Sequence, residues 1–91
     1  MAILKFTPAL ARFFPSLDSP IDLEGQSVKE IMVNLEKMYP GLRGYILDDQ
    51  HRLRPHVHIF INGVLIKDVL RLSDGVGERD EIFIIQALSG G

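Results

Sequence analysis

The sequence contains no cysteine. Without a thiol the chain can form no disulfide, offers no thiolate nucleophile and cannot hold an iron–sulfur cluster or a cysteine-ligated zinc ion. This absence excludes much redox and metal chemistry, although it does not identify a cellular compartment.

The chain also lacks an excess of charge of either sign. Ten lysine and arginine residues stand against twelve aspartate and glutamate residues, which gives a net charge of -2. Binding a polyanion through general electrostatics needs a basic surface. We therefore expect no nucleic acid among the partners of this protein.

Long apolar runs are missing as well. No run approaches the length of a membrane-spanning helix, and the first residues lack a basic segment followed by an apolar one. We expect a cytoplasmic protein that does not associate with membranes. Its 91 residues, 46% of them hydrophobic, are enough for one small folded domain, which has little room for a deep catalytic pocket.

The clearest local signal is the start of a helix. Ser27 and Glu30 have the spacing of a capping box, in which the two side chains bind backbone N–H groups of the first turn. The apolar residues that follow at spacings of three and four are Val28, Ile31, Met32, Leu35, Met38 and Tyr39. Pro40-Gly41 then ends the predicted helix, whose apolar stripe must be covered by a sheet.

Five short apolar segments are predicted to be strands, over residues 2–6, 19–23, 57–61, 64–66 and 81–88. Asn62-Gly63 joins the third and fourth as a tight hairpin, because both central turn residues need positive φ. The last segment is very apolar, which favours a central position beside the first strand. This order predicts an α+β protein with the β-grasp, or ubiquitin-like, layout: a mixed sheet of about five strands on one main helix.

The remaining segments connect these elements. Residues 41–55 are interpreted as an irregular connection, the one in which we most expect flexibility, and Leu42, Tyr45, Ile46 and Leu47 could pin a short helical turn within it. Leu70 and Leu72 are predicted to pack a later turn. The predicted domain covers residues 1–88 and is followed by a flexible Ser-Gly-Gly tail, residues 89–91.

Alternation along the strands predicts a second apolar surface. If Val57, Ile59, Ile61, Ile82 and Ile84 face the helix, then His58, Phe60, Phe83 and Ile85 emerge on the opposite face of the sheet. Small soluble proteins seldom leave such a patch uncovered, so we interpret these four residues, with Leu88 at the base of the tail, as a partner-docking surface. Two alternatives are that residues 41–55 fold over this face, or that it forms a homodimer contact.

No metal site is expected. His56 and His58 share a strand face at a spacing of two residues, and such a pair can ligate a metal. A secure third ligand is missing, because His51 lies in a loop of unknown geometry. Asp48-Asp49 is interpreted as a solvated loop pair, since no histidine or second carboxylate pair is placed to make an acid–base site.

Residues 80–91, DEIFIIQALSGG, resemble the terminal signature of the ThiS/MoaD family of ubiquitin-like sulfur carriers. Together with Thr7 to Arg12, the helix from Ser27 and the hairpin from Val57 to Ile66, the resemblance covers nearly the whole chain. Thr7 to Arg12, Arg54-Pro55-His56 and Asn62-Gly63 look most like the carriers of cysteine biosynthesis. One departure is Gln86-Ala87, where many members have one or two prolines, so that the exit angle of the tail can differ here.

This resemblance implies that the chain is a substrate for enzymes and supplies no catalytic groups itself. In the family an E1-like enzyme uses ATP and magnesium to adenylate the terminal carboxylate, here that of Gly91, and sulfur then replaces oxygen to give a thiocarboxylate. Gly90 and Gly91 would enter the narrow site of that enzyme, because glycine has no Cβ. The implied partners are the E1-like enzyme and a sulfur-accepting biosynthetic enzyme, with no cofactor bound stably.

Besides a plain β-grasp interaction module with an inert tail, two other functions remain open at this point. The chain could be a protein modifier joined through Gly91 to lysines, as ubiquitin is. It could also be a non-covalent subunit whose tail enters the active site of a larger partner, as the small subunit of molybdopterin synthase does. The residues do not indicate whether the sulfur would go to cysteine, thiamine or molybdopterin.

Overall fold

The structure is a computed structural model that describes residues 1–7 and 20–86. In chain order its elements are β1 (Ala2–Phe6), β2 (Ile21–Leu23), α2 (Val28–Met38), α3 (Arg43–Ile46), β3 (Val57–Ile61), β4 (Val64–Leu65) and β5 (Glu81–Gln86). The predicted second strand is shorter than expected, since it begins at Ile21, after Pro20, which has no N–H to donate to a ladder. Residues 87 and 88 of the predicted last strand, the expected domain end and the tail lie outside the described residues.

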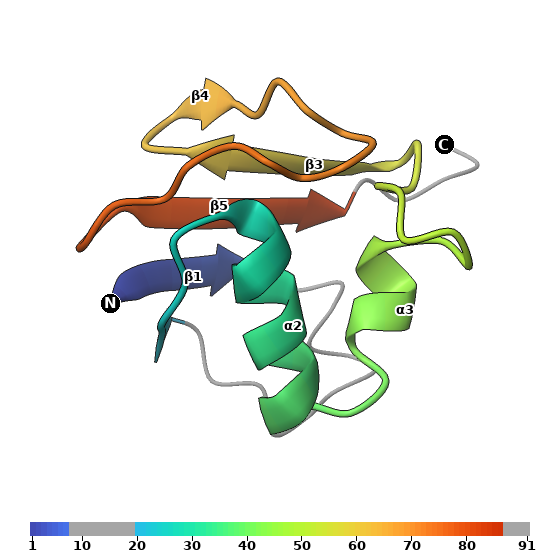
Figure 1. The fold of residues 1–91 in the computed structure, drawn as a ribbon, viewed down its shortest axis with the longest axis horizontal. Coiled ribbons are helices and arrows are strands. Elements are labelled where there is room, and N and C mark those ends of the chain that lie inside the picture. The colour runs from blue at the N-terminus through green and yellow to red at the C-terminus, as the bar shows by residue number, and fades with distance from the viewer. Residues whose placement is uncertain (8–19, 87–91) are drawn as a thin grey trace.

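The five strands form one mixed sheet in the order β2-β1-β5-β3-β4. β5 lies at its centre, parallel to β1 and antiparallel to β3, as the apolar last segment predicts. α2 lies across one face of this sheet (Figure 1). The predicted layout is therefore confirmed: one main helix on a mixed five-stranded sheet.

The α2 helix begins where the sequence predicts. The Ser27 hydroxyl accepts a hydrogen bond from the Glu30 N–H at 3.2 Å, while the Glu30 carboxylate accepts one from the Gln26 N–H at 3.4 Å. Val28, Ile31, Met32 and Leu35 are buried. Met38, the last helical residue, is 52% exposed. Its assignment to the buried stripe was therefore wrong.

The segment 41–55 joins the core instead of remaining fully irregular. It contains α3, and Leu42, Ile46 and Leu47 are buried among the core residues, as predicted, whereas Tyr45 is 38% exposed. α3 lies beside the far end of α2 (Figure 1). This segment therefore extends the helical layer that covers one face of the sheet.

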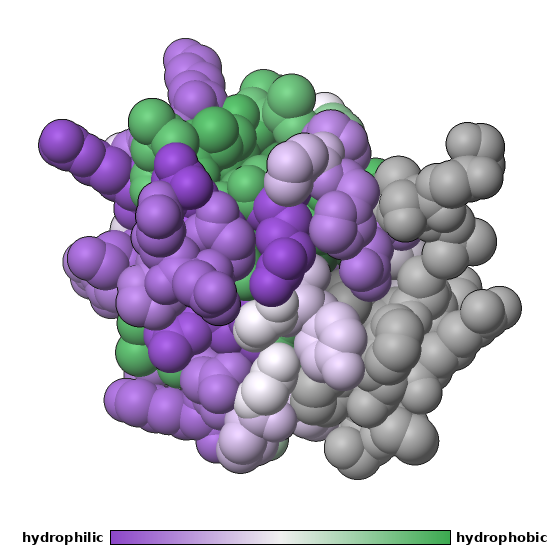
Figure 2. Space-filling view, turned by 90° about the vertical axis from the view of Figure 1, so that its right-hand side faces the viewer, coloured by the Kyte–Doolittle hydropathy of each residue, from purple (hydrophilic) through white to green (hydrophobic). Residues whose placement is uncertain are grey.

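Hydrophobic side chains also gather along one edge of the molecule, over the β4 side of the sheet (Figure 2). The exposed apolar residues of β4 and of the segment after it are Val64, Leu65, Val69 and Leu70. Leu72 is buried as predicted, but Leu70 is 63% exposed and does not pack the turn. Its N–H is bound by the Asp68 carboxylate in a local turn, which directs the backbone without burying the side chain.

The carboxylate of Asp74 closes the loop between β4 and β5. The Asp74 carboxylate accepts hydrogen bonds from the N–H groups of Lys67 and Asp68, and the backbone carbonyls of Asp74 and Leu72 in turn accept from the first N–H groups of α2. The N–H of Lys67 and then that of Asp68 lower the pKa of Asp74 below its usual value. The loop is thus fastened by a carboxylate and itself caps the main helix.

We expect Asp74→Asn to lower the free energy of unfolding at pH 7. A carboxyl whose pKa is lowered by folding stabilises the folded state above its unfolded pKa, and this contribution disappears as the pH falls through the lowered value. The free energy of unfolding, measured with urea, should therefore differ less between Asp74→Asn and the unaltered chain at pH 2.5 than at pH 7. The exposed Asp49 gives the control variant Asp49→Asn, and an equal loss of stability in both variants would contradict the loop assignment.

Candidate functional site: an apolar face on the sheet

The face of the sheet opposite α2 carries a row of apolar side chains. Cross-strand pairing places Phe60 of β3 opposite Phe83 of β5, and Phe60 also lies opposite Leu65 of β4. Phe83 is 39% exposed and Leu65 is 49% exposed, while Phe60 is half-buried. Because directly opposed side chains on one sheet face are in contact range, Leu65, Phe60 and Phe83 form one apolar row across three strands.

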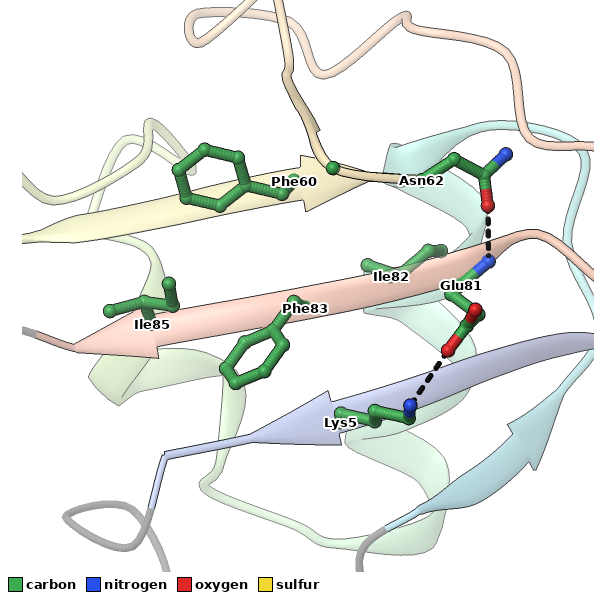
Figure 3. A pocket seen from close by; sticks show the side chains of 8 residues that line it. Lys5, Phe60, Asn62, Glu81, Ile82, Phe83 and Ile85 are labelled. Atoms are coloured by element: carbon green, nitrogen blue, oxygen red, sulfur yellow. Dashed lines mark hydrogen bonds and ion pairs between the residues drawn. The ribbon is translucent and has the colours of Figure 1, made fainter.

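A shallow depression of about 390 Å³ lies on this row. Figure 3 shows Phe60, Phe83 and Ile85 side by side on neighbouring strands, with Lys5 and Glu81 at the margin. Lys5 is the β1 neighbour of Phe83, and its Nζ lies 2.7 Å from Oε1 of Glu81. Both of these charged side chains are about half exposed, so the ion pair forms a polar rim and adds little to stability.

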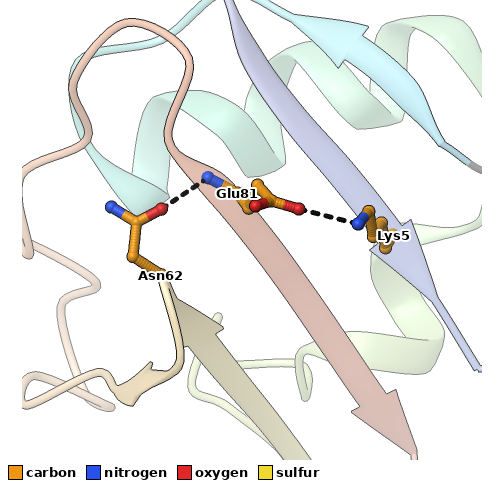
Figure 4. A network of polar contacts seen from close by, with 3 residues as sticks. All are labelled: Lys5, Asn62 and Glu81. Carbon is orange, nitrogen blue, oxygen red and sulfur yellow. Dashed lines mark hydrogen bonds and ion pairs between the residues drawn. The ribbon is translucent and has the colours of Figure 1, made fainter.

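The hairpin turn is fastened to the beginning of β5. Asn62 Oδ1 accepts a hydrogen bond from the Glu81 N–H at 2.9 Å, and Asn62 Nδ2 donates to Asp80 at 3.0 Å. Figure 4 shows the chain of contacts from Asn62 through Glu81 to Lys5. The Gly77 N–H, and after it the Asn62 amide, lower the pKa of Asp80. These contacts fix the register that places Phe60 opposite Phe83.

The turn itself has the backbone that the sequence predicts, with φ of 51° at Asn62 and 84° at Gly63. Such a two-residue turn pairs Ile61 with Val64 and therefore Phe60 with Leu65. The sequence interpretation did not include Leu65 or Lys5 in this face. Counting residue pairs outward from the Asn62-Gly63 turn would have placed Leu65 opposite Phe60, on this face. Because Leu4 and Phe6 are buried on the other face, alternation along the strand would have placed Lys5 here as well.

The structure places His58, Phe60, Phe83 and Ile85 on this one face, while Val57, Ile59, Ile82 and Ile84 are buried and Ile61 packs against the core. No residue of the segment 41–55 lines the depression, and this segment packs with α2 instead, so the described part of the chain does not support its folding over this face. Leu88, Gly90 and Gly91 lie outside the described residues. Docking of a partner on this face stays a prediction.

The histidines are dispersed. His56 precedes β3 and lies 3.4 Å from the Gln86 amide through its Nε2, whereas His58 is exposed opposite Ile85. Within residues 1–7 and 20–86, no three His, Asp or Glu side chains are grouped closely enough to hold a metal ion. In the same ranges no helix is long and apolar enough to span a bilayer.

Several solved structures share this fold. A chain of the Amycolatopsis orientalis BexX/CysO complex superimposes with a TM-score of 0.84 at 19% identity, with 100% of both chains covered. The small archaeal modifier protein 1 (SAMP1) of Methanosarcina acetivorans gives 0.79 at 25% identity, covering 99% of this chain and 95% of that one. Urm1 of Trypanosoma brucei gives 0.70 at 21% identity, covering 99% and 94%.

No curated protein matches the sequence. The model of the ThiS family matches residues 16–91, which is most of the chain and includes β2, the main helix, the hairpin, β5 and the terminal Gly90-Gly91. The resemblance drawn from the residues is thereby confirmed, and the superpositions confirm the β-grasp fold. The chain belongs to the ThiS family, with the ubiquitin-like architecture that the order of its elements predicts.

Proposed function

We propose that this chain is a sulfur-carrier protein whose Gly91 carboxylate is adenylated by an E1-like enzyme and converted to a thiocarboxylate. The observation that carries the proposal is the ThiS family match, which extends through β5 to Gly90-Gly91. The chain acts as a protein co-substrate and contributes no catalytic group. ATP and magnesium belong to the activating enzyme.

The proposed chemistry has two steps. A Gly91 carboxylate oxygen attacks the α-phosphorus of ATP, so that an acyl-adenylate forms and pyrophosphate leaves. A hydrosulfide ion then attacks the carbonyl carbon of the acyl-adenylate. AMP leaves with one of the two carboxylate oxygens, and the sulfur stays on the Gly91 carbon as the thiocarboxylate, which loses its proton to solvent. Both steps need the terminal carbon inside a narrow site, which is why two glycines without Cβ atoms at the end of the chain suit this chemistry.

The apolar row on the open sheet face is the surface we assign to the activating enzyme. Phe60, Phe83 and Leu65 supply the apolar centre, and the Lys5–Glu81 pair supplies a charged rim, which is the usual anatomy of a protein interface. The face belongs to β5, the strand that leads into the tail, so docking there would also direct the tail. CysO of A. orientalis forms a complex with BexX, which supports a protein partner for the present chain.

The second candidate function is protein modification, in which the activated Gly91 is joined to a lysine of another protein. The specific observation in its favour is the superposition with SAMP1, which is named a modifier and is 25% identical. Both functions begin with the same adenylation. They differ in the product, because a modifier leaves an isopeptide bond, and a carrier leaves a free thiocarboxylate or a regenerated carboxylate.

The test is an intact-mass measurement after incubation with ATP, magnesium, a sulfide donor and the E1-like enzyme of the host. We expect a mass increase equal to the replacement of one oxygen by sulfur, localised to Gly91 by fragmentation. Conjugation of Gly91 to lysine would favour the modifier instead. An unchanged mass, with the enzyme shown to be active on another carrier, would contradict both functions.

A further inference from the structure

A groove of about 440 Å³ lies on the helical side of the molecule, where α2, the chain from α3 onward and the segment after β4 meet. Figure 1 shows the segment after β4 lying beside the beginning of α2. The groove shares no lining residue with the depression on the apolar row, which lies on the face of the sheet opposite α2. It is therefore a separate surface of the molecule.

Backbone hydrogen bonds hold the walls of this groove together. The Lys29 N–H donates to the carbonyl of Leu72 at 2.9 Å, which joins α2 to the segment after β4. The Leu53 N–H donates to the carbonyl of Val69 at 3.2 Å, which joins the chain that follows α3 to the same segment. Because the groove is formed before a partner arrives, a partner loses less free energy in ordering it.

Much of the lining of the groove is apolar. Met32, Leu47 and Leu72 are buried, whereas Val33 of α2 is 37% exposed and Leu70 is 63% exposed. Exposed apolar side chains that line a groove together with buried ones form a surface that a large apolar side chain of a partner can cover.

The charged side chains of the groove are cationic. They belong to Lys29, Arg43 and Arg71, and among the described lining residues none is acidic, although the whole chain has a net charge of -2. Arg43 lies close to Glu36, whose carboxylate accepts the Arg43 N–H at 3.0 Å. Lys29 and Arg71 are exposed and form no ion pair with any residue of the described ranges, so their charges remain to be met by a ligand.

Helix stability does not account for a lysine at position 29. Lys29 lies in the first turn of α2, where the helix dipole is positive and disfavours a cation. Lys29 and Arg71 also repel each other as like charges that line one groove. Carboxylates of a ligand would relieve both of these unfavourable interactions.

We propose that this groove binds an acidic segment of a partner protein, in which aspartate or glutamate residues flank one large apolar residue. The carboxylates pair with Lys29 and Arg71, and the apolar side chain contacts Val33 and Leu70. A nucleic acid fits less well, because no Phe, Tyr or Trp is found among the described lining residues for a base to stack on.

This binding goes beyond the proposed function. It uses neither the Gly91 carboxylate nor the apolar row, so one partner can hold the chain at the groove while an enzyme occupies the open face of the sheet. The attraction depends on exposed charges, so we expect salt to weaken it.

The test begins with a selection from a phage-displayed library of random peptides. Peptides that bind the charge-reversed chain, with Lys29→Glu and Arg71→Glu together, are removed first, so that the remaining binders of the unaltered chain depend on these two cations. The charge-reversed chain should fold, because both residues are exposed and glutamate suits the first turn of a helix. We expect enrichment of peptides that carry several aspartates or glutamates around a leucine, isoleucine or phenylalanine.

A selected peptide is then synthesised, and its affinity is measured by fluorescence anisotropy. The charge-reversed chain should bind it more weakly by a factor of about ten or more. The matched control combines Lys37→Glu and Lys67→Glu, two exposed lysines outside the groove. This control changes the net charge by the same amount and should reduce the affinity by less than a factor of about two, since distant exposed charges are screened.

A second pair of variants tests the apolar contact. Leu70→Gln should reduce the affinity by a factor of about five or more, because it removes apolar surface that the peptide covers. Val64→Gln is its control, since Val64 is 66% exposed, much as Leu70 is, and does not line the groove. The control should bind the peptide as the unaltered chain does.

Failure to enrich any peptide on the folded chain would overturn the proposal, and so would enrichment of peptides without net negative charge. Equal affinities within either pair of variants would remove the groove as the docking site. A chain that selects no acidic peptide but sediments with phosphatidylserine vesicles through Lys29 and Arg71 would assign the groove to a membrane and overturn a protein partner. None of these results depends on Gly91 or on the activating enzyme, so this proposal and the proposed function fail separately.

Discussion

Removal of Gly90 and Gly91 is expected to abolish formation of the thiocarboxylate while leaving the unfolding free energy of the domain unchanged. The reacting carbon belongs to Gly91, and a chain that ends at Ser89 places its carboxylate two residues short of the enzyme's reaction centre. Proximity contributes so much to such reactions that a displacement of this size should eliminate turnover rather than reduce it. The measurement is the intact-mass assay, accompanied by urea unfolding of both chains.

A matched control for this deletion is Gly44→Ala, which changes a glycine elsewhere in the chain. An added Cβ at Gly44 has no atom within 4 Å, so this variant should fold and be activated as the unaltered chain is. If the chain without Gly90-Gly91 were still adenylated or thiocarboxylated, the terminal glycines would not be the reacting end and the proposed function would be wrong.

The second large effect is expected from Phe60→Asp, which should weaken binding to the activating enzyme by a factor of thirty or more. Phe60 lies between Phe83 and Leu65 at the centre of the apolar row, and a charge there must be desolvated when a partner covers the row. Loss of a central aromatic anchor typically costs about 2 kcal/mol or more, and about 1.4 kcal/mol corresponds to a factor of ten. The affinity can be measured by isothermal titration calorimetry.

The same hairpin supplies the control. Val64 is 66% exposed and lies opposite Ile61, whose side chain packs against the core, so Val64 belongs to the other face of the sheet. Val64→Asp should therefore leave the affinity unchanged. Leu65→Asp provides a second test on the same face as Phe60. Because Leu65 is 49% exposed, this variant should fold. Equal affinities for Phe60→Asp, Leu65→Asp and Val64→Asp would remove the docking assignment.

Several features of this protein were determined by the sequence alone, because they depend on neighbours within a few residues. The helix is capped at Ser27 since its hydroxyl accepts the N–H of Glu30 in the first turn, while the Glu30 carboxylate accepts the N–H of Gln26 just before the cap. The hairpin forms at Asn62-Gly63 since both residues adopt positive φ at little cost. The errors lie at the ends of such patterns: Met38 and Leu70 continue an apolar spacing at positions where the side chain stays exposed.

The candidate site was decided by the tertiary structure. Alternation assigned Phe60 and Phe83 to one face, but only the pairing of β3 with β5 placed them opposite each other, and only the parallel pairing of β1 with β5 brought Lys5 beside Phe83. Strand order follows from burial of the whole apolar surface of the chain, and the spacing of residues along one segment does not contain that information.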